Sequence, residues 1–251
     1  MSRALWAVLA ATAAVGVVFA AWPGLDLAAA HFFYDGGGFI GASPLARAGR
    51  WFFRVAPFVA LAGFVIPYLQ ARWGKPAERW LSHSSASLGA PAAAVGGALA
   101  RAIGWFGARL RWAPDGRSVV FLIATIAIGS GLIVNLGLKD HAHRPRPVHV
   151  VEFGGQDEFR PWDRFDGACR KNCSFASGEA ASAFWMVAPA LLAPPPWRAP
   201  AVAGALVFGA AASALRMAFG GHFLSDVLLG GLISLLTILV VRRLLWPRGG
   251  P

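Results

Sequence analysis

Histidine, aspartate and basic residues in the carboxyl-terminal half of the chain have spacings that suit chemistry on an oxyanion. His222 and Asp226 lie four positions apart at the start of an apolar segment, so they share one face of a helix. The aspartate can accept a hydrogen bond from one ring nitrogen and leave the other free to act as a nucleophile. Lys139, Arg146 and Arg216 supply cations from three separate chain positions, which suits a phosphate with several oxygen faces.

A further polar cluster opens another apolar segment. Ser177 and Gly178, at a helix amino terminus, offer backbone N–H groups and the positive end of the helix dipole to an anion, and Glu179 follows them. Each residue also has an ordinary structural interpretation. A basic residue beside a membrane span can anchor to lipid headgroups, and an acid in a first turn favours the helix dipole. No single residue therefore indicates a phosphate site, and the prediction depends on all the clusters together.

The elements that must position these clusters are apolar helices. The 251 residues are 57% hydrophobic and 14% charged, yet their formal net charge is +11. A nucleic-acid-binding tail would be basic without being so apolar, so nucleic acid is not an expected partner. A bilayer core of about 30 Å needs roughly 20 apolar residues per helix. Six runs approach this requirement: Ala4–Trp22, Trp51–Gln70, Ser118–Leu138, Ala176–Ala193, Ala199–Leu215 and Phe223–Val241.

The expected fold is all-α, a polytopic bundle of six transmembrane helices that forms a single domain over residues 1–251. The Ala/Gly-rich segment Ser84–Ala108, which contains Pro91, predicts an additional amphipathic helix on the membrane surface, with Arg101, Arg109 and Arg111 toward lipid headgroups. A seventh span is the less favoured alternative. A secretory signal peptide is the alternative for the first run, which follows Arg3. The length of that run, and the Trp22 at its end, favour a membrane span.

The cations are divided unevenly between the two sides that six spans define. One side would hold both termini, residues 71–117 and the turn 194–198, and it carries 12 cations and 2 acids. The rest of the chain carries 11 cations and 10 acids. The positive-inside rule then predicts cytoplasmic termini. All three polar clusters would lie at the opposite face, which is the periplasmic face of a bacterial inner membrane.

The clusters resemble the signature of the type 2 phosphatidic acid phosphatase superfamily, which includes lipid phosphate phosphatases and vanadium haloperoxidases. Its first part, a lysine, six residues and Arg-Pro, matches Lys139 to Arg146–Pro147, and its third part matches Arg216, His222 and Asp226. The resemblance implies that His222 attacks phosphorus to form a phosphohistidine, that Asp226 orients it, and that no metal or other cofactor takes part. It assigns the phosphoryl oxygens to five residues: Lys139, Arg146, Ser177, Gly178 and Arg216.

Three positions depart from the family signature. Ala176 replaces a proline, Leu215 replaces a serine, and Glu179 replaces the histidine that protonates the leaving group. We expect Glu179 to be the general acid once bound phosphate has neutralised the nearby cations. His141 and His143, inside the first motif, are the alternative acids.

The loop before the second motif contains the only two cysteines of the chain. Cys169 and Cys173 are four residues apart, within reach of each other in a helical turn, and an oxidising periplasm favours a disulfide between them. A zinc site at His141, His143 and His149 is a weaker alternative. The segment 152–166 predicts either a lid over the substrate or a solvated loop.

A site at the end of apolar helices favours a phosphate held at headgroup height on a lipid. The family suggests lipid A, undecaprenyl diphosphate, phosphatidylglycerol phosphate or phosphatidic acid, with lipid A or another envelope lipid preferred. Two other functions stay open: a phosphotransferase that uses a polyprenyl diphosphate donor, and a non-catalytic anion-binding protein or transporter. The sequence leaves the oligomeric state undefined.

Overall fold

The computed structural model describes residues 3–86, 94–102 and 113–248. Within these residues the chain forms helices, turns and loops, and β-pairing is limited to two isolated bridges. The expected all-α fold is therefore confirmed. The chain divides into two compact units, Met1–Phe58 with Phe121–Pro251, and Val59–Val120. A single domain over residues 1–251 stays a prediction.

Among the described residues, five helices are long and apolar enough to cross a membrane. They correspond to five of the six expected spans. They are α1 (Arg3–Ala21), α3 (Pro44–Ala86), α5 (Gly116–Thr125) continued by the π-helical η2 (Ile126–Leu138), α8 (Pro195–Ala218) and α9 (Leu224–Leu245). The short elements are α2 (Gly24–His31), η1 (Ile40–Ala42), η3 (Pro147–His149) and η4 (Val151–Phe153).

The expected span Ala176–Ala193 is broken, so a count of six spans is not confirmed. It consists of two short helices, α6 (Gly178–Phe184) and α7 (Val187–Leu191). Pro189 lacks the N–H that would reach the carbonyl of Trp185, and that carbonyl accepts from Ala188 at 2.7 Å instead. The break is held in place because the buried Trp185 indole donates to Thr125 Oγ1 at 2.9 Å.

The expected surface helix over Ser84–Ala108 lies largely outside the described residues. Residues 94–102, which are described, are helical.

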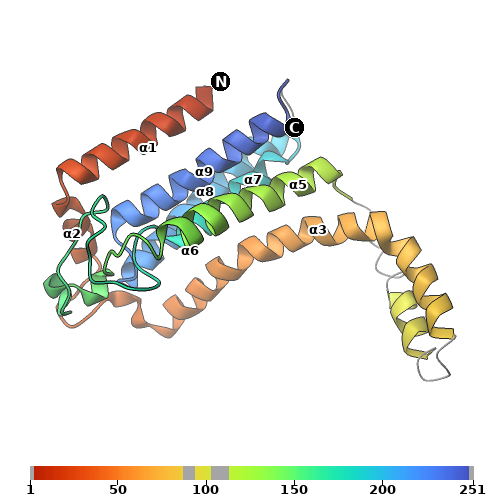
Figure 1. The fold of residues 1–251 in the computed structure, drawn as a ribbon, viewed down its shortest axis with the longest axis horizontal. Helices are drawn as coiled ribbons and strands as arrows, with labels where there is room; N and C mark the ends of the chain where they lie inside the picture. Colours follow the sequence, from red (N-terminus) through yellow and green to blue (C-terminus); the bar gives the residue numbers. More distant parts are fainter. Residues whose placement is uncertain (1–2, 87–93, 103–112, 249–251) are drawn as a thin grey trace. The chain divides into compact units, whose positions relative to one another are not determined.

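Helix α9 is the centre of the larger unit and packs against α1, α6, α8 and η2. The start of α9 also contacts the start of α6, because the Ser177 N–H donates to the Asp226 carbonyl at 3.1 Å. Gly230 permits this approach, since a Cβ there would lie 2.8 Å from the Ser177 carbonyl oxygen. In Figure 1 the start of α1 and the end of α9 lie at one end of this unit, and α2 and the loops before α6 lie at the other.

Candidate active site

His222 is held in one tautomer by the backbone. Its side chain is 1% exposed, and its Nδ1 lies 2.7 Å from the Ser174 carbonyl oxygen. A carbonyl can only accept, so Nδ1 carries the proton and Nε2 keeps its lone pair. Burial lowers the pKa of His222 to about 4. The ring is therefore a neutral base or nucleophile near pH 7.

Asp226 supports His222 less directly than the sequence suggested. Its Oδ2 lies 3.8 Å from Nδ1 of His222, which is too long for a hydrogen bond. The same oxygen instead accepts from Ser174 Oγ at 2.5 Å and from the Phe223 N–H at 2.8 Å. Asp226 thus fixes the two segments that hold the histidine, and the Ser174 carbonyl takes the imidazole proton.

A buried guanidinium, which the sequence analysis did not identify, joins Asp226 to α2. Arg144 donates to Asp226 Oδ1 at 2.5 Å and to Asp26 Oδ2 at 2.7 Å, and all three side chains are 0% exposed. Ser225 completes the network, since its N–H and hydroxyl both donate to Asp26, at 2.8 and 2.7 Å. Burial raises the pKa of Asp26, and the guanidinium opposes that shift. The network locks the first turn of α9 to the loop after η2.

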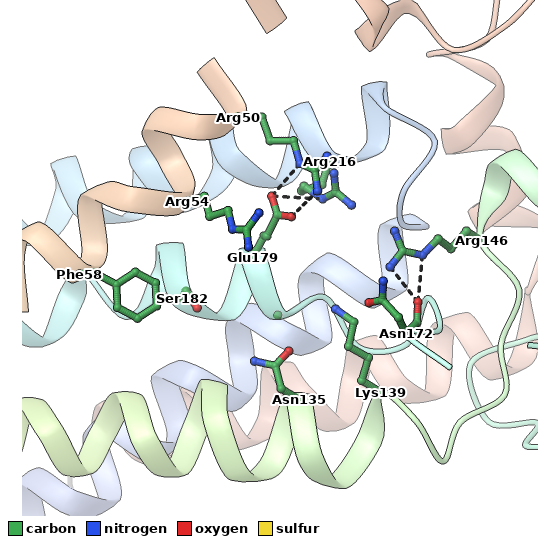
Figure 2. A pocket seen from close by; sticks show the side chains of 11 residues that line it. Arg50, Arg54, Phe58, Asn135, Lys139, Arg146, Asn172, Glu179, Ser182 and Arg216 are labelled. Atoms are coloured by element: carbon green, nitrogen blue, oxygen red, sulfur yellow. Dashed lines mark hydrogen bonds and ion pairs between the residues drawn. The ribbon is translucent and has the colours of Figure 1, made fainter. Parts of the chain in front are cut away.

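A polar cavity of about 320 Å³ gathers most of the predicted phosphate-binding residues (Figure 2). Lys139, Arg146, Gly178, Glu179 and Arg216 all line it. Its wall also includes six residues that were not proposed as ligands: Arg50, Arg54, Phe58, Asn135, Asn172 and Ser182. His222 is not among these wall residues, and its side chain is buried.

Glu179 lies between two arginines in this cavity. Its carboxylate accepts from Arg50 at 2.7 and 3.2 Å, and Arg216 Nε lies 3.5 Å from it. Figure 2 shows this carboxylate joined to Arg50 and Arg216. Bidentate pairing with a guanidinium favours the ionised carboxylate, so Glu179 is a base in this state.

The other two motif cations, Lys139 and Arg146, line the same cavity apart from this ion pair (Figure 2). Burial and the neighbouring Arg146 lower the pKa of Lys139. Arg146 donates through Nε and a terminal nitrogen to the Asn172 carbonyl, at 3.1 and 2.8 Å. Burial also lowers the pKa of Arg146, and the charge of Arg50 adds to that effect.

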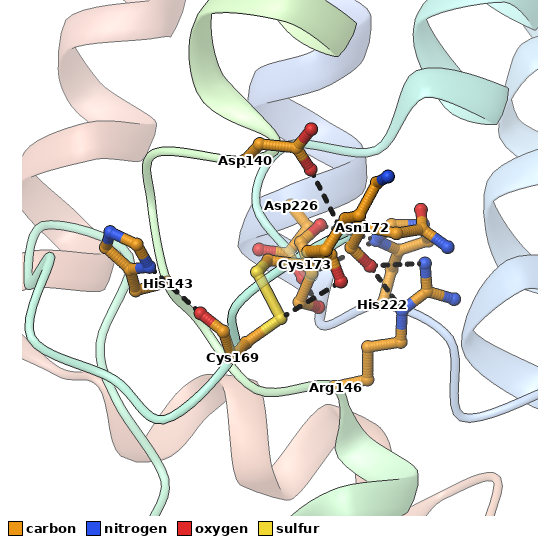
Figure 3. Close-up of a disulfide and its surroundings, with 10 residues drawn as sticks. Asp140, His143, Arg146, Cys169, Asn172, Cys173, His222 and Asp226 are labelled. Carbon is orange, nitrogen blue, oxygen red and sulfur yellow. Dashed lines mark hydrogen bonds and ion pairs between the residues drawn. A yellow bond between two sulfur atoms is a disulfide. The ribbon is translucent and has the colours of Figure 1, made fainter.

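A disulfide brackets the residue that anchors Arg146. Cys169 and Cys173 are bonded, and Asn172 between them donates its N–H to Asp140 at 2.7 Å (Figure 3). The loop is thereby tied to the first motif.

The sequence profile of the PAP2 superfamily matches residues 118–249. The chain belongs to the PAP2 superfamily. Three relatives are each named "Lipid A 4'-phosphatase". The relative from Francisella tularensis subsp. novicida is 39% identical over 131 residues, 52% of this chain and 59% of the relative. The relatives from Rhizobium leguminosarum and Rhizobium etli are each 41% identical over 122 residues, covering 52% and 48% of their lengths.

The chain therefore spans about half the length of the relatives it matches. No solved structure matches it significantly.

The PAP2 superfamily match contains every residue of the predicted signature, but several cavity and network residues precede it. Asp26, Arg50 and Arg54 lie before residue 118. The sequence does mark each of them as unusual, because a charged residue flanked by apolar residues is costly to bury without a partner. The partners themselves could not be read from the sequence.

The second PAP2 motif uses its polar groups partly for structure. Ser177 caps α6 by accepting from the Ala180 N–H at 3.3 Å, and its own N–H is bonded to Asp226. Gly178 lines the cavity, and a Cβ at this position would overlap the Asn135 amide. Phosphate binding by Ser177 and Gly178 stays a prediction, with Gly178 in the better position.

The alternative acids do not line the cavity among the described residues. His143 Nδ1 lies 2.9 Å from the Cys169 carbonyl, and His141 is exposed. The segment 152–166 packs on the buried network, since the Arg160 carbonyl accepts from Arg144 at 2.8 Å. This hydrogen bond attaches part of the segment 152–166 to the buried network of Arg144, Asp26 and Asp226.

Proposed function

We propose that this protein is a membrane phosphatase that removes a phosphate from an envelope lipid through a phosphohistidine at His222. The observation that carries the proposal is the hydrogen bond from Nδ1 to the Ser174 carbonyl, at 2.7 Å. It leaves Nε2 as the nucleophilic nitrogen, and the polar cavity supplies five cations. Positioned cations stabilise the phosphoryl oxygens, where a transferring phosphoryl group carries its charge, so the proposed reaction needs no metal.

The proposed reaction has two steps. In the first, the Nε2 lone pair of His222 bonds to phosphorus, and the bond from phosphorus to the lipid oxygen breaks. Glu179 gives its proton to that oxygen, so the lipid leaves as an alcohol. In the second, a water oxygen bonds to phosphorus, Glu179 takes a proton of the water, and the bond from phosphorus to Nε2 breaks. Free phosphate leaves, and His222 regains its Nε2 lone pair.

Glu179 must acquire a proton to serve as this acid. The substrate phosphate would compete for Arg50 and Arg216 and would bring negative charge beside the carboxylate, and both effects raise the pKa of a carboxyl group. Glu179 is a better candidate than His141 or His143 because it lines the cavity.

Lipid A is the proposed substrate, because three relatives are named for lipid A 4'-phosphatase activity. We also infer that the site faces the periplasm of a bacterial inner membrane and that the termini are cytoplasmic. The division of charge over the sequence supports this orientation. The α6–α7 pair would supply the sixth crossing as a broken helix packed against α8 and α9.

Purified protein in detergent, assayed for phosphate release, tests the proposal. The panel should contain lipid A, its 4'-dephosphorylated form, undecaprenyl diphosphate, phosphatidylglycerol phosphate and phosphatidic acid, each with and without a chelator. We expect release from intact lipid A that survives the chelator and is abolished by His222→Ala. Release that His222→Ala leaves unchanged would contradict the catalytic assignment.

A further inference from the structure

An apolar groove of about 670 Å³ lies between α1 and the rest of the larger unit, outside the proposed active site. Its described walls share no residue with those of the polar cavity. The Thr12 hydroxyl, one of its few polar groups, donates to the Val8 carbonyl at 2.7 Å and is therefore satisfied within α1. The residues that α1 contributes recur every three or four positions and share one helix face: Leu9, Thr12, Ala13, Gly16, Val17 and Ala20.

The groove has the depth of one membrane leaflet. Leu9 and Ala20 mark the ends of its face on α1, and they are eleven residues apart, which is about 16 Å of helix. This is roughly half of a bilayer core of about 30 Å, and α1 is long and apolar enough to cross that core.

Aromatic side chains mark the end of the groove that lies toward the active-site loops. The Trp162 indole N–H donates to the Gly16 carbonyl at 3.1 Å, and Phe165, which is 54% exposed, also lines the groove. Tryptophan and other large aromatic residues gather at the headgroup level of a membrane. We therefore expect the groove to run from the headgroups into the hydrocarbon of the leaflet that the proposed site faces.

An acyl chain suits the walls of this groove better than water does. A bound water needs about two to four polar partners, which these walls lack, and an empty groove loses dispersion contacts with its lining. Leu9 and Val17 are exposed on the same face of α1, so the groove is continuous with the surface that this helix presents to lipid.

The charges at the mouth of the groove indicate the headgroup. Asp163 is the only charged residue among the described walls, and Arg164, the next residue, is exposed. An acid beside a base complements a zwitterionic headgroup, whose ammonium group would lie at Asp163. The same acid disfavours the phosphates of lipid A, so the charges favour a lipid other than the proposed substrate.

We propose that this groove binds one acyl chain of a zwitterionic bilayer phospholipid that is not a substrate. The site goes beyond the proposed function, because it lies apart from the phosphate cavity and takes a different lipid.

The floor of the groove connects this lipid to the nucleophile. Phe175 lines the groove, and the centre of its ring is 5.6 Å from that of Trp162. It directly follows Ser174, whose carbonyl accepts from His222 and whose hydroxyl donates to Asp226. A chain in the groove would hold Phe175 in place, and with it the contact that fixes the imidazole. The bound phospholipid would therefore raise turnover by positioning His222.

Ala13 and Ala11 provide matched variants. Both residues are exposed on α1, but only Ala13 lines the groove. Ala13→Phe would fill the groove, whereas Ala11→Phe places the same ring about 160° away round the helix. Both changes add apolar surface to a lipid-facing helix, so neither should disturb folding.

The first experiment counts bound lipids by native mass spectrometry of delipidated full-length protein, supplied with dioleoyl phosphatidylcholine or dioleoyl phosphatidylglycerol. The wild type should bind one phosphatidylcholine at least about tenfold more tightly than phosphatidylglycerol. Ala13→Phe should weaken phosphatidylcholine binding at least about tenfold, and Ala11→Phe should leave it unchanged. Asp163→Asn, which leaves the groove walls in place, should remove the preference between the two headgroups.

Three results of this experiment would overturn the proposal. They are equal phosphatidylcholine binding by Ala13→Phe and Ala11→Phe, a headgroup preference that survives Asp163→Asn, and displacement of phosphatidylcholine by lipid A. The last result would assign the groove to a chain of the substrate.

The second experiment measures turnover of lipid A by delipidated enzyme with and without phosphatidylcholine. The added lipid should raise kcat about fivefold or more in the wild type and in Ala11→Phe, with little change in KM, and should have no effect in Ala13→Phe. Saturable binding without a rise in kcat would overturn the link to His222. If no lipid releases phosphate but selective phosphatidylcholine binding depends on Ala13 and Asp163, the proposed phosphatase function fails and the lipid site stands.

Discussion

Arg50 holds Glu179 in a bidentate ion pair, at 2.7 and 3.2 Å, from a helix more than 120 residues earlier in the chain. Glu179 occupies the position where the family signature has a histidine. In the proposed mechanism Glu179 replaces that histidine as the general acid, so a carboxylate paired with Arg50 must be protonated before it can serve as a donor.

We expect Glu179→Gln to lower kcat by about 10²- to 10⁴-fold, the usual contribution of a general acid. Glu179→His should recover part of the rate, because it restores the side chain of the family signature. His141→Ala and His143→Ala should change turnover little. Steady-state kinetics on purified variants makes the comparison, and a fully active glutamine variant would rule out Glu179 as the acid.

The pH profile should reflect the low pKa of His222. The nucleophile is the neutral ring, which is lost as the pH falls through its pKa, and burial places that pKa at about 4. We expect kcat/KM to persist well below pH 6.5, the ordinary histidine value, and to fall near pH 4. An acid limb near pH 6.5 would show that His222 is solvated when it reacts.

Asp26 should act through Arg144 and Asp226 as a positioning residue. Removing one member of a buried ion pair costs about 3–5 kcal/mol of stability, so Asp26→Ala should lower the unfolding temperature in detergent. Asp26→Asn, which keeps the shape, should fold better and lower kcat with little change in KM. Glu152→Gln, at an exposed acid, is the control. An Asp26→Asn variant with normal kcat would limit Asp26 to a structural role.

Reduction of the disulfide should weaken substrate binding through Arg146. Opening Cys169–Cys173 frees Asn172, whose carbonyl orients the guanidinium. A loosened charge-assisted contact, of about 1.5–3 kcal/mol, predicts a rise in KM of about tenfold or more. The test is KM with and without reductant in the wild type and in Arg146→Gln. If reductant raises KM equally in both proteins, the disulfide does not act through Arg146.

The sequence predicted residues whose chemistry depends on local spacing. His222 and Asp226 lie four apart, and the cations Lys139, Arg146 and Arg216 belong to segments that the predicted spans would bring to one face of the membrane. The structure brings Lys139, Arg146 and Arg216 to one cavity. The helical class was also predictable, since long apolar runs have few alternatives in a bilayer.

Contacts between distant segments were not predictable. Arg144 is two residues from Arg146 in the same motif, yet it is buried against Asp26 while Arg146 lines the cavity. The spacing of the motif does not distinguish these two arginines, because both lie in the same short segment. Their different roles depend on where α2 packs, which the local sequence does not encode. The break between α6 and α7 lies within an uninterrupted apolar run, so hydropathy alone predicts one span there.

The most direct test is detection of a phosphoryl group on His222. Lipid A labelled in its 4'-phosphate is mixed with excess enzyme, quenched within milliseconds under alkaline conditions, which preserve phosphohistidine, and mapped by mass spectrometry. We predict label on the peptide that contains His222, absent from His222→Ala, and more persistent in Glu179→Gln because the proposed water attack also uses this residue. Phosphate release from the wild type without label on His222 at any time, or full release by His222→Ala, would contradict the mechanism.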